Sequence, residues 1–278
     1  MDSAAAKALS ERIFAPVEIV EGRLDAGALI LCDHASNALP EEYGDLGLPK
    51  SAFQRHIAYD IGAAWLTRRL AKRLGAPALL TTFSRLLIDP NRGHDDPTLV
   101  MRYSDGAIVP GNGRVDEDEI ERRKRRYWRP YRERIRETIA AMMATGETPA
   151  ILSIHSFTPI WRGKKRPWKL GVLWDADPRL PEVLLKAFAQ GLSLKPGEIG
   201  DNEPYDGALA GDTIDDVATA LHLANALIEV RQDLIATRES AEGWADRLAE
   251  VAAPLVARAD LRAPRDFGSR IIDGLRAR

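Results

Sequence analysis

Three short apolar runs in the sequence each lead to a side chain that could do chemistry. These side chains are Asp33 and His34 after the run ALILC, His155 after AILSI, and Glu229 after ALI. Runs this short and apolar are typical of buried strands, and the first two follow turn-forming residues. Ligands of open α/β sheets bind outside the carboxyl ends of the strands. Two imidazoles and a carboxylate delivered there indicate a hydrolytic metal centre, with the imidazoles as ligands and the carboxylate as general base.

The sequence leaves the third metal ligand open. A catalytic zinc usually takes three protein ligands and keeps one position for water. Asp60 is the leading candidate, although a residue expected to open a helix is equally suited to be an ordinary N-cap. Glu42 and Asp33 are weaker candidates, and Asp33 could instead orient an imidazole from behind. Asn37, three residues after His34, carries an amide, which is a poor zinc ligand.

Glu229 lies in an apolar strand, where a carboxylate is costly unless it is paired or functional. Arg231 follows two residues later, on the same face of the strand. The two side chains either form a structural ion pair, or Glu229 activates a metal-bound water while Arg231 holds substrate. Partial burial would raise the pKa of Glu229 towards a range that is useful for proton transfer.

A carboxylate-binding pocket is predicted around the string SRLLIDPNR. Asn91 and Arg92 follow an expected strand at 86–88 through an Asp-Pro turn. Arg92 can bind a carboxylate there with two parallel hydrogen bonds, and Asn91 adds a further donor. Arg85 is a second cation for the same pocket. The alternative is a surface turn with an internal Arg–Asp pair.

Other polar segments are less informative. Tyr205, in the loop GDNEPYDG, either donates a hydrogen bond from a loop that covers substrate or belongs to a plain surface turn. Residues 93–113 form the longest stretch without periodicity, and loops of that length are usually functional or disordered. His56, His94 and His222 have no comparable setting and are expected to be bystanders, with His94 as a candidate pocket wall.

Composition narrows the class of protein. With 39 basic and 41 acidic residues, neither nucleic acid nor an anionic membrane is indicated as a partner. Cys32 is the only cysteine, so no internal disulfide can form, which fits a reducing compartment. The N-terminal residues lack a signal pattern, and no apolar run approaches the roughly 20 residues that span a bilayer. A cytoplasmic protein is expected, of undetermined oligomeric state.

Helix-like and strand-like segments alternate along the chain. Helices are expected at 63–74, 116–144 with a break near Pro130, 180–190, 212–224 and 241–253, the last between the N-cap Ser240 and a stop at Pro254. Strands are expected at 28–32, 78–82, 86–88, 151–154, 170–174 and 226–230. This alternation predicts a three-layer α/β/α fold with a mostly parallel sheet. We expect one catalytic domain over residues 1–278, with its core at about 25–260.

Six strings occur in the order CDHASNALPEEY, HIAYDIGA, SRLLIDPNR, SIHSF, GDNEPYDG and ALIEVRQDLI, over roughly residues 25–250. Together they resemble the N-formylglutamate amidohydrolase family, which is similar in fold and site to the wider zinc carboxypeptidase and aspartoacylase group. The resemblance implies a zinc-dependent hydrolase on a mixed, mostly parallel sheet, with other divalent metals possible. The order of the six strings is specific, whereas no single string is.

Carried over residue by residue, the resemblance implies that His34 and His155 bind the metal and that Glu229 is the general base. Zinc would lower the pKa of its water, and Glu229 would take the proton and pass it to the leaving amine. Asn91-Arg92 would match the pair that binds the substrate carboxylate. The wider group has a glutamate ligand three residues after the first histidine, and this chain departs from that pattern with an asparagine.

The resemblance makes N-formyl-L-glutamate the default substrate, with formate and the amino acid as products. Arg85 would help to stabilise the developing oxyanion. The glutamate side chain would need one more cation, for which Arg231 or Arg102 could serve. Two alternatives stay open: a metal-dependent deacylase or peptidase acting on another N-acyl amino acid or small peptide, and a metal-free carboxylate-binding protein of the same fold. No glycine-rich phosphate loop is present, which argues against nucleotide binding.

Overall fold

The apolar runs form a central seven-stranded sheet in the computed structural model, which describes residues 14–271. Its strands, in chain order, are β1 (Val17–Val20), β2 (Ala28–Cys32), β3 (Ala78–Thr81), β6 (Ala150–Phe157), β9 (Leu170–Leu173), β10 (Ile199–Asp201) and β11 (Asn225–Arg231). Outside the sheet lie two short hairpins, β4 (Tyr103–Ser104) with β5 (Ala107–Ile108) and β7 (Ile160–Trp161) with β8 (Lys164–Lys165).

The sheet is mixed and mostly parallel, as predicted. Its strands lie in the order β1-β3-β2-β6-β11-β9-β10. The four neighbours β3, β2, β6 and β11 run parallel, whereas β1 is antiparallel to β3 and β9 is antiparallel to β11. Because β2, β6 and β11 are adjacent and parallel, the residues at their carboxyl ends meet at one edge of the sheet.

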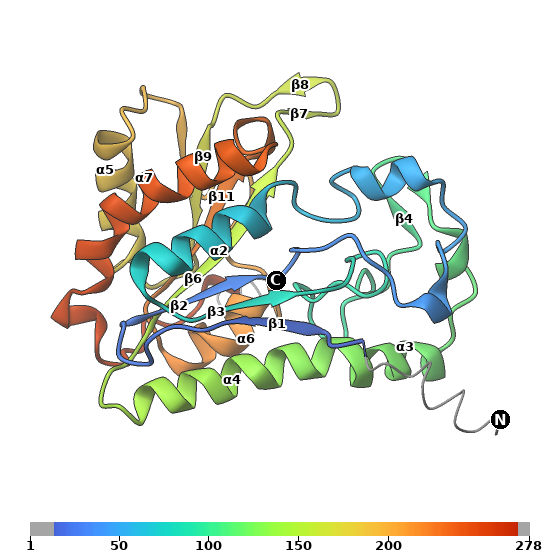
Figure 1. Ribbon diagram of the computed structural model, residues 1–278, viewed down its shortest axis with the longest axis horizontal. Helices are drawn as coiled ribbons and strands as arrows, with labels where there is room; N and C mark the ends of the chain where they lie inside the picture. The colour runs from blue at the N-terminus through green and yellow to red at the C-terminus, as the bar shows by residue number, and fades with distance from the viewer. Residues whose placement is uncertain (1–13, 272–278) are drawn as a thin grey trace.

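Helices cover both faces of the sheet and complete the three layers (Figure 1). One face carries α2 (Ala63–Leu74), α5 (Pro181–Gly191) and α7 (Arg238–Val256), and the other carries α4 (Arg129–Met143) and α6 (Thr213–Val217). Helix α2 packs through residues at helical spacing, including Ala63, Leu66 and Leu70. Consecutive strand residues alternate between the layers, so Ile30 packs on the α2 side and Leu31 on the α4 side.

The helix expected at 116–144 is interrupted before the proline. Helix α3 (Glu117–Arg123) passes into a π-helical stretch at Lys124–Trp128, and α4 then begins at Arg129. Pro130 has no N–H and cannot bond to the carbonyl four residues earlier, so the irregular hydrogen bonding lies just ahead of it.

The prediction of a strand at 86–88 is wrong, because these buried residues form a turn. Side chains, and not a neighbouring strand, bind two of its carbonyl groups. The amide of Asn112 donates to the carbonyl of Leu86 (2.8 Å), and the guanidinium of Arg123 donates to the carbonyl of Leu87 (2.8 Å). Residues 86–88 are therefore apolar because they are buried, although they do not belong to the sheet.

The last third of the chain differs from expectation in two places. Helix α6 ends at Val217 and a 3-10 turn follows, so the helix expected at 212–224 is much shorter. Helix α7 begins earlier than expected, because the side chain of Thr237, and not that of Ser240, caps it. Pro254 lies inside the last turn of α7 and did not end the helix where expected. Because proline has no N–H, the carbonyl of Glu250 lacks its helical hydrogen bond, but Glu250 is exposed.

No helix between residues 14 and 271 combines the length and the apolar character needed to cross a membrane. Residues 1–13, on which the argument against a signal peptide rests, lie outside the described range.

Candidate active site

Three buried side chains converge at the carboxyl edge of the sheet. His34 follows β2, His155 lies near the end of β6, and Asp60 comes from the turn before α2. One ligand atom from each lies within 4.8 Å of the others. This arrangement brings together the three predicted metal ligands.

The Asp60 turn is fixed against the end of β2. The backbone N–H of Asp60 donates to the carbonyl of His34 (2.9 Å), and its carboxylate accepts from the N–H of Ser156 (3.2 Å). Gly62 allows the turn to pass close to the segment that follows β11. Its φ is 83°, and a Cβ at this position would lie 2.0 Å from the carbonyl oxygen of Ile235. Asp60 precedes α2 and does not cap it, since Gly62 holds the N-cap position.

A carboxylate lies behind each imidazole. Nε2 of His34 is 2.6 Å from Asp89, and Nε2 of His155 is 3.0 Å from Asp33. Because an ionised carboxylate only accepts hydrogen bonds, each Nε2 carries a proton. Both Nδ1 atoms face the same oxygen of Asp60, at 3.6 Å from His34 and 2.9 Å from His155. Imidazoles oriented in this way by carboxylates are typical metal ligands.

The polar atoms present fit a divalent cation. Nδ1 of His34 is buried without a hydrogen-bond partner, which a metal bond would supply. Burial opposes ionisation of Asp33, but hydrogen bonds and the charge of His155 outweigh it and lower the pKa of Asp33 to about 2. The pKa of Asp89 and that of Asp60 are also lowered against burial by neighbouring cations. The three carboxylates therefore give the site negative charge.

In the metal-free protein, the imidazole of His155 holds a proton between Asp33 and Asp60. Burial disfavours the charged form of His155, yet hydrogen bonds to Asp33 and Asp60 raise its pKa well above the ordinary value. Binding of a cation between these groups would displace that proton.

Glu229 lies beside the candidate ligands. In the pairing of β11 with β6 it is directly opposite His155, so both side chains point to the same face. Glu229 is 5% exposed, and burial raises its pKa to about 7. Its Oε2 atom is buried and has no hydrogen-bond partner.

The alternative ion pair between Glu229 and Arg231 is wrong. The strand ends at Arg231, and its guanidinium turns to Asp233 (2.8 Å) and to the carbonyl of Arg166 (3.3 Å). Arg231 does not line the cavity at the site either. The sequence alone could not show where the side chain turns once the strand has ended.

A cavity of about 550 Å³ is lined by the candidate metal ligands and Glu229. Among the side chains that line it are the other four predicted site residues, Arg85, Asn91, Arg92 and Tyr205. Arg85 pairs with Asp60, and the carbonyl oxygen of the Asn91 side chain accepts from the N–H of Thr213 (3.0 Å). The amino group of that amide is thus the part left to donate.

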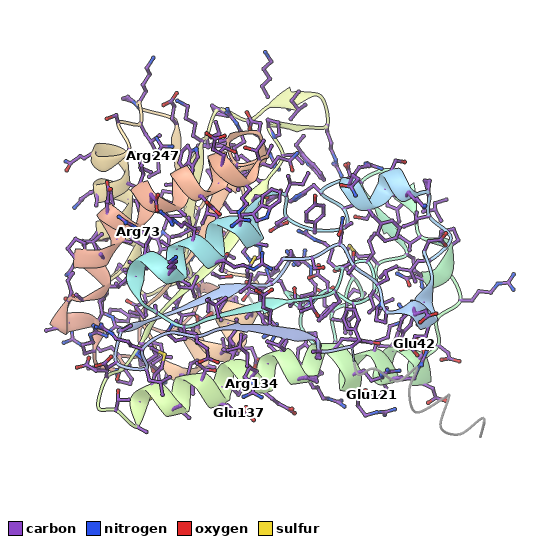
Figure 2. All side chains as sticks on the ribbon, viewed as in Figure 1. Glu42, Arg73, Glu121, Arg134, Glu137 and Arg247 are labelled. Carbon is purple, nitrogen blue, oxygen red and sulfur yellow. The ribbon has the colours of Figure 1, made fainter. Side chains whose placement is uncertain are left out.

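The other candidates for the third ligand are engaged elsewhere. Asn37 donates to the carbonyl of Phe53 (2.7 Å), and Asp33 holds His155. Glu42 pairs with Arg122 (3.0 Å), and Figure 2 shows it beside α3. Asp60 is therefore the carboxylate that completes the set.

Sequence reasoning missed three residues at this site. His56, expected to be a bystander, lines the cavity with its Nδ1 3.5 Å from Asp60, and burial lowers its pKa to about 3. Asp89 was interpreted as part of a turn and not as the partner of an imidazole. Arg166 is buried, and its guanidinium donates to the hydroxyl of Tyr205 (3.0 Å). The spacing of His56 four residues before Asp60 was the one available signal.

The long loop at 93–113 also takes part. It contains the β4–β5 hairpin and contributes Met101, Ser104 and Asp105 to the cavity. His94 lines a separate cavity together with Arg102.

Comparison with known proteins places this geometry in a family. The family model described as N-formylglutamate amidohydrolase matches residues 26–236. A gene product of Agrobacterium tumefaciens has a structure similar over 88% of this chain and 98% of its own, with 32% identity and a TM-score of 0.80. The N-formylglutamate amidohydrolase of Ralstonia eutropha JMP134 is 20% identical over 87% of this chain and 97% of its own, with a TM-score of 0.60. A comparison with proteins of curated function gave no match.

At 20% identity the Ralstonia structure supports the fold alone, whereas the family match covers most of the chain and includes every residue of the site. The chain therefore belongs to the N-formylglutamate amidohydrolase family.

Proposed function

We propose that this protein is a zinc-dependent amidohydrolase that cleaves an N-formyl amino acid, or a similar N-acyl amino acid, to the free amino acid and the acid. N-formyl-L-glutamate, after which the family is named, is the reference substrate. The observation that carries the proposal is the pair of carboxylate-oriented imidazoles facing Asp60, next to the buried Glu229.

The ligands would be Nδ1 of His34, Nδ1 of His155 and the carboxylate of Asp60. Two nitrogen donors and one oxygen donor suit zinc, and three protein ligands are usual for a catalytic site. When bound, the ion supplies Lewis acidity that makes a water molecule nucleophilic near neutral pH.

Glu229 handles the proton. Its carboxylate accepts a proton from the attacking water and then donates it to the nitrogen of the leaving amine. A pKa of about 7 suits both steps, because the group is then neither a very weak base nor a very weak acid at neutral pH.

Three further side chains position the substrate. Arg92 and the amino group of Asn91 bind the carboxylate of the amino acid, since both line the cavity and both are donors. Arg85 lies at the cavity beside Asp60 and adds positive charge near the carbonyl oxygen that becomes an oxyanion.

The test is Glu229→Gln, which keeps size and hydrogen bonding but removes the base. We expect zinc content close to that of the wild type, measured by mass spectrometry of the metal, and a loss of turnover of about 10²- to 10⁴-fold in a formate-release assay. Glu198→Gln makes the same chemical change outside the cavity and is expected to keep full activity.

Retained turnover in Glu229→Gln would refute the assigned role. Absence of zinc from the wild-type protein, with no stabilisation on adding zinc, would favour the metal-free binding protein instead. Parallel assays with N-formyl and N-acetyl amino acids and a dipeptide separate a deformylase from another deacylase or a peptidase.

A further inference from the structure

Part of the cavity has no role in the proposed chemistry. Besides the polar residues of the proposed mechanism, large apolar side chains line the cavity, and they are here called the apolar wall. The apolar wall consists of Ile57, Met101, Trp161, Leu173, Leu209 and Leu227. Since the candidate metal ligands, the base and the carboxylate clamp are all polar, the apolar wall is the part of the lining that suits an apolar substrate side chain.

The position of the apolar wall next to the base supports this assignment. Leu227 lies two residues before Glu229 on β11, on the same face, and is paired in register with Leu173 on β9. Both leucines are buried, at 6% and 3% exposed. The segment after Tyr205 covers them and adds Leu209. A substrate whose amide lies at Glu229 would therefore direct a neighbouring group along apolar surface.

A second carboxylate on the substrate would find, among the described arginines that line the cavity, none without an acidic partner besides Arg92. Within residues 14–271, Arg85 pairs with Asp60, Arg231 pairs with Asp233, and Arg102 lines a different cavity. In the same range, Arg166 has only neutral partners, Tyr205 and Thr158, but it does not line the cavity.

Arg92 is the exception. Its closest described carboxylate, that of Asp96, is 4.0 Å away. In the proposed function this guanidinium already binds the carboxylate of the amino acid.

Three further acidic residues lie at the cavity. Asp105, Asp206 and Asp212 all line it. Asp105 pairs with Arg55 and Asp206 pairs with Arg270, and neither of these arginines lines the cavity. The carboxylate of a glutamate side chain would be desolvated among these acids without a partner, which is unfavourable.

We propose that this enzyme prefers N-acyl amino acids with uncharged, apolar side chains, of the leucine, methionine or phenylalanine type, over N-acylglutamate. The inference rests on the proposed function and specifies its substrate class. An apolar side chain gains by leaving water for the apolar wall, whereas a carboxylate in the same place loses its hydration.

The experiment compares kcat/KM of the zinc-loaded enzyme for the N-formyl derivatives of leucine, methionine, glutamine, glutamate and lysine. Glutamine and glutamate differ in charge at constant size and isolate the electrostatic effect. We expect leucine and methionine to exceed glutamate by about 10-fold or more, and glutamine also to exceed glutamate. A glutamate derivative as good as the leucine one, or a lysine derivative better than both, would overturn the inference.

Binding to Glu229→Gln provides a second measurement that does not need turnover. Calorimetry of this variant with N-formylleucine and N-formylglutamate should give the lower Kd for leucine. If neither compound is hydrolysed by the wild type, the proposed function fails, while the order of the two Kd values still decides the inference.

A substitution in the apolar wall tests the cause. Leu209 is 36% exposed at the rim, and Leu209→Arg would supply the missing cation. We expect the glutamate-to-leucine ratio of kcat/KM to rise by about 10-fold or more. Leu221→Arg, an exposed leucine that does not line the cavity, is the control and should leave the ratio unchanged. An unchanged ratio in Leu209→Arg would contradict the inference.

Discussion

Asp89 and Asp33 hold the two imidazoles from behind, and their value lies in orientation more than in charge. Each fixes the proton on Nε2 and leaves Nδ1 directed at Asp60. Asp89 belongs to the same turn as Asn91, so the position of one ligand and that of the substrate clamp depend on a single short segment.

Asp89→Asn is expected to weaken zinc binding by about 10- to 100-fold while leaving the fold intact. The amide no longer forces a proton onto Nε2 of His34, because it can also donate. Competition with a chromophoric chelator measures the Kd. Asp105→Asn, which changes another carboxylate at the cavity, is the control, and equal affinity in both variants would argue against the orienting role.

Glu229 is expected to make the protein less stable as the pH rises. Burial raises its pKa from the ordinary 4.5 to about 7, so the folded protein binds this proton more tightly than the unfolded chain. The resulting stabilisation is present below pH 4.5 and is lost as the pH rises through about 7, by about 3 kcal/mol in total.

Glu229→Gln removes this dependence. In the metal-free protein, the variant should gain free energy of unfolding relative to the wild type between pH 5 and pH 8, measured by urea titration at both values. A constant difference between the two proteins across this range would mean that the carboxylate titrates normally.

The sequence identified His34, His155 and Glu229 because each follows or interrupts an apolar strand, which is a local signal. Asp60 stayed ambiguous because a short carboxylate before a helix serves equally as a cap and as a ligand. The pairing of His34 with Asp89 spans 55 residues and depends on how β2 approaches a distant turn. No local pattern contains that information.

Helix α4 contributes to the site through one buried cation. Arg132 is fully buried and donates to the carbonyls of Pro90 (2.9 Å) and Asp212 (2.9 Å), besides pairing with Asp216 (2.9 Å). It thereby ties the turn that carries the substrate clamp to the start of α6. Arg136, one turn later, pairs with the same aspartate at the surface (2.6 Å).

Arg132→Met is expected to lower the free energy of unfolding by about 3 kcal/mol or more, because several buried carbonyls and Asp216 lose their partner. Arg136→Met removes an exposed pair with the same carboxylate and should cost less than about 1 kcal/mol. Urea unfolding of both variants makes the comparison. Equal losses would show that α4 does not hold this turn.

Helix α2, whose apolar residues recur with a clear period, was predicted well, and so were the five sheet strands that are continuous apolar runs. Strands β1 and β10 were not expected from the sequence. The run 86–88 was misread, because a buried turn and a buried strand have the same composition. Its backbone partners, Asn112 and Arg123, come from segments that only the fold brings near. The start of α7 was predicted too late because Thr237 and Ser240 can both cap a helix, and the sequence does not show which of them does.

At the scale of the whole molecule, the proposed metal ligands come from three separate parts of the chain. His34, Asp60 and His155 belong to the β2 end, the turn before α2, and β6. A cation that binds the folded form alone stabilises the entire domain by linkage.

Zinc at about 100 times its Kd is expected to add about 2.7 kcal/mol and to raise the melting temperature measured by calorimetry. His155→Ala should show no such rise. A rise of equal size in that variant would place the binding elsewhere.

The register of β11 against β6 fixes the distance between base and ligands, and this limits how the chain can change in length. Deletion of one residue in β11 ahead of Glu229 would bring Val230 opposite His155 and turn the acid into the layer packed by α2 and α7. The β4–β5 and β7–β8 hairpins lie outside the sheet, so a change in their length does not alter this register. Within β6 and β11, by contrast, selection must preserve the number of residues as strictly as their identity.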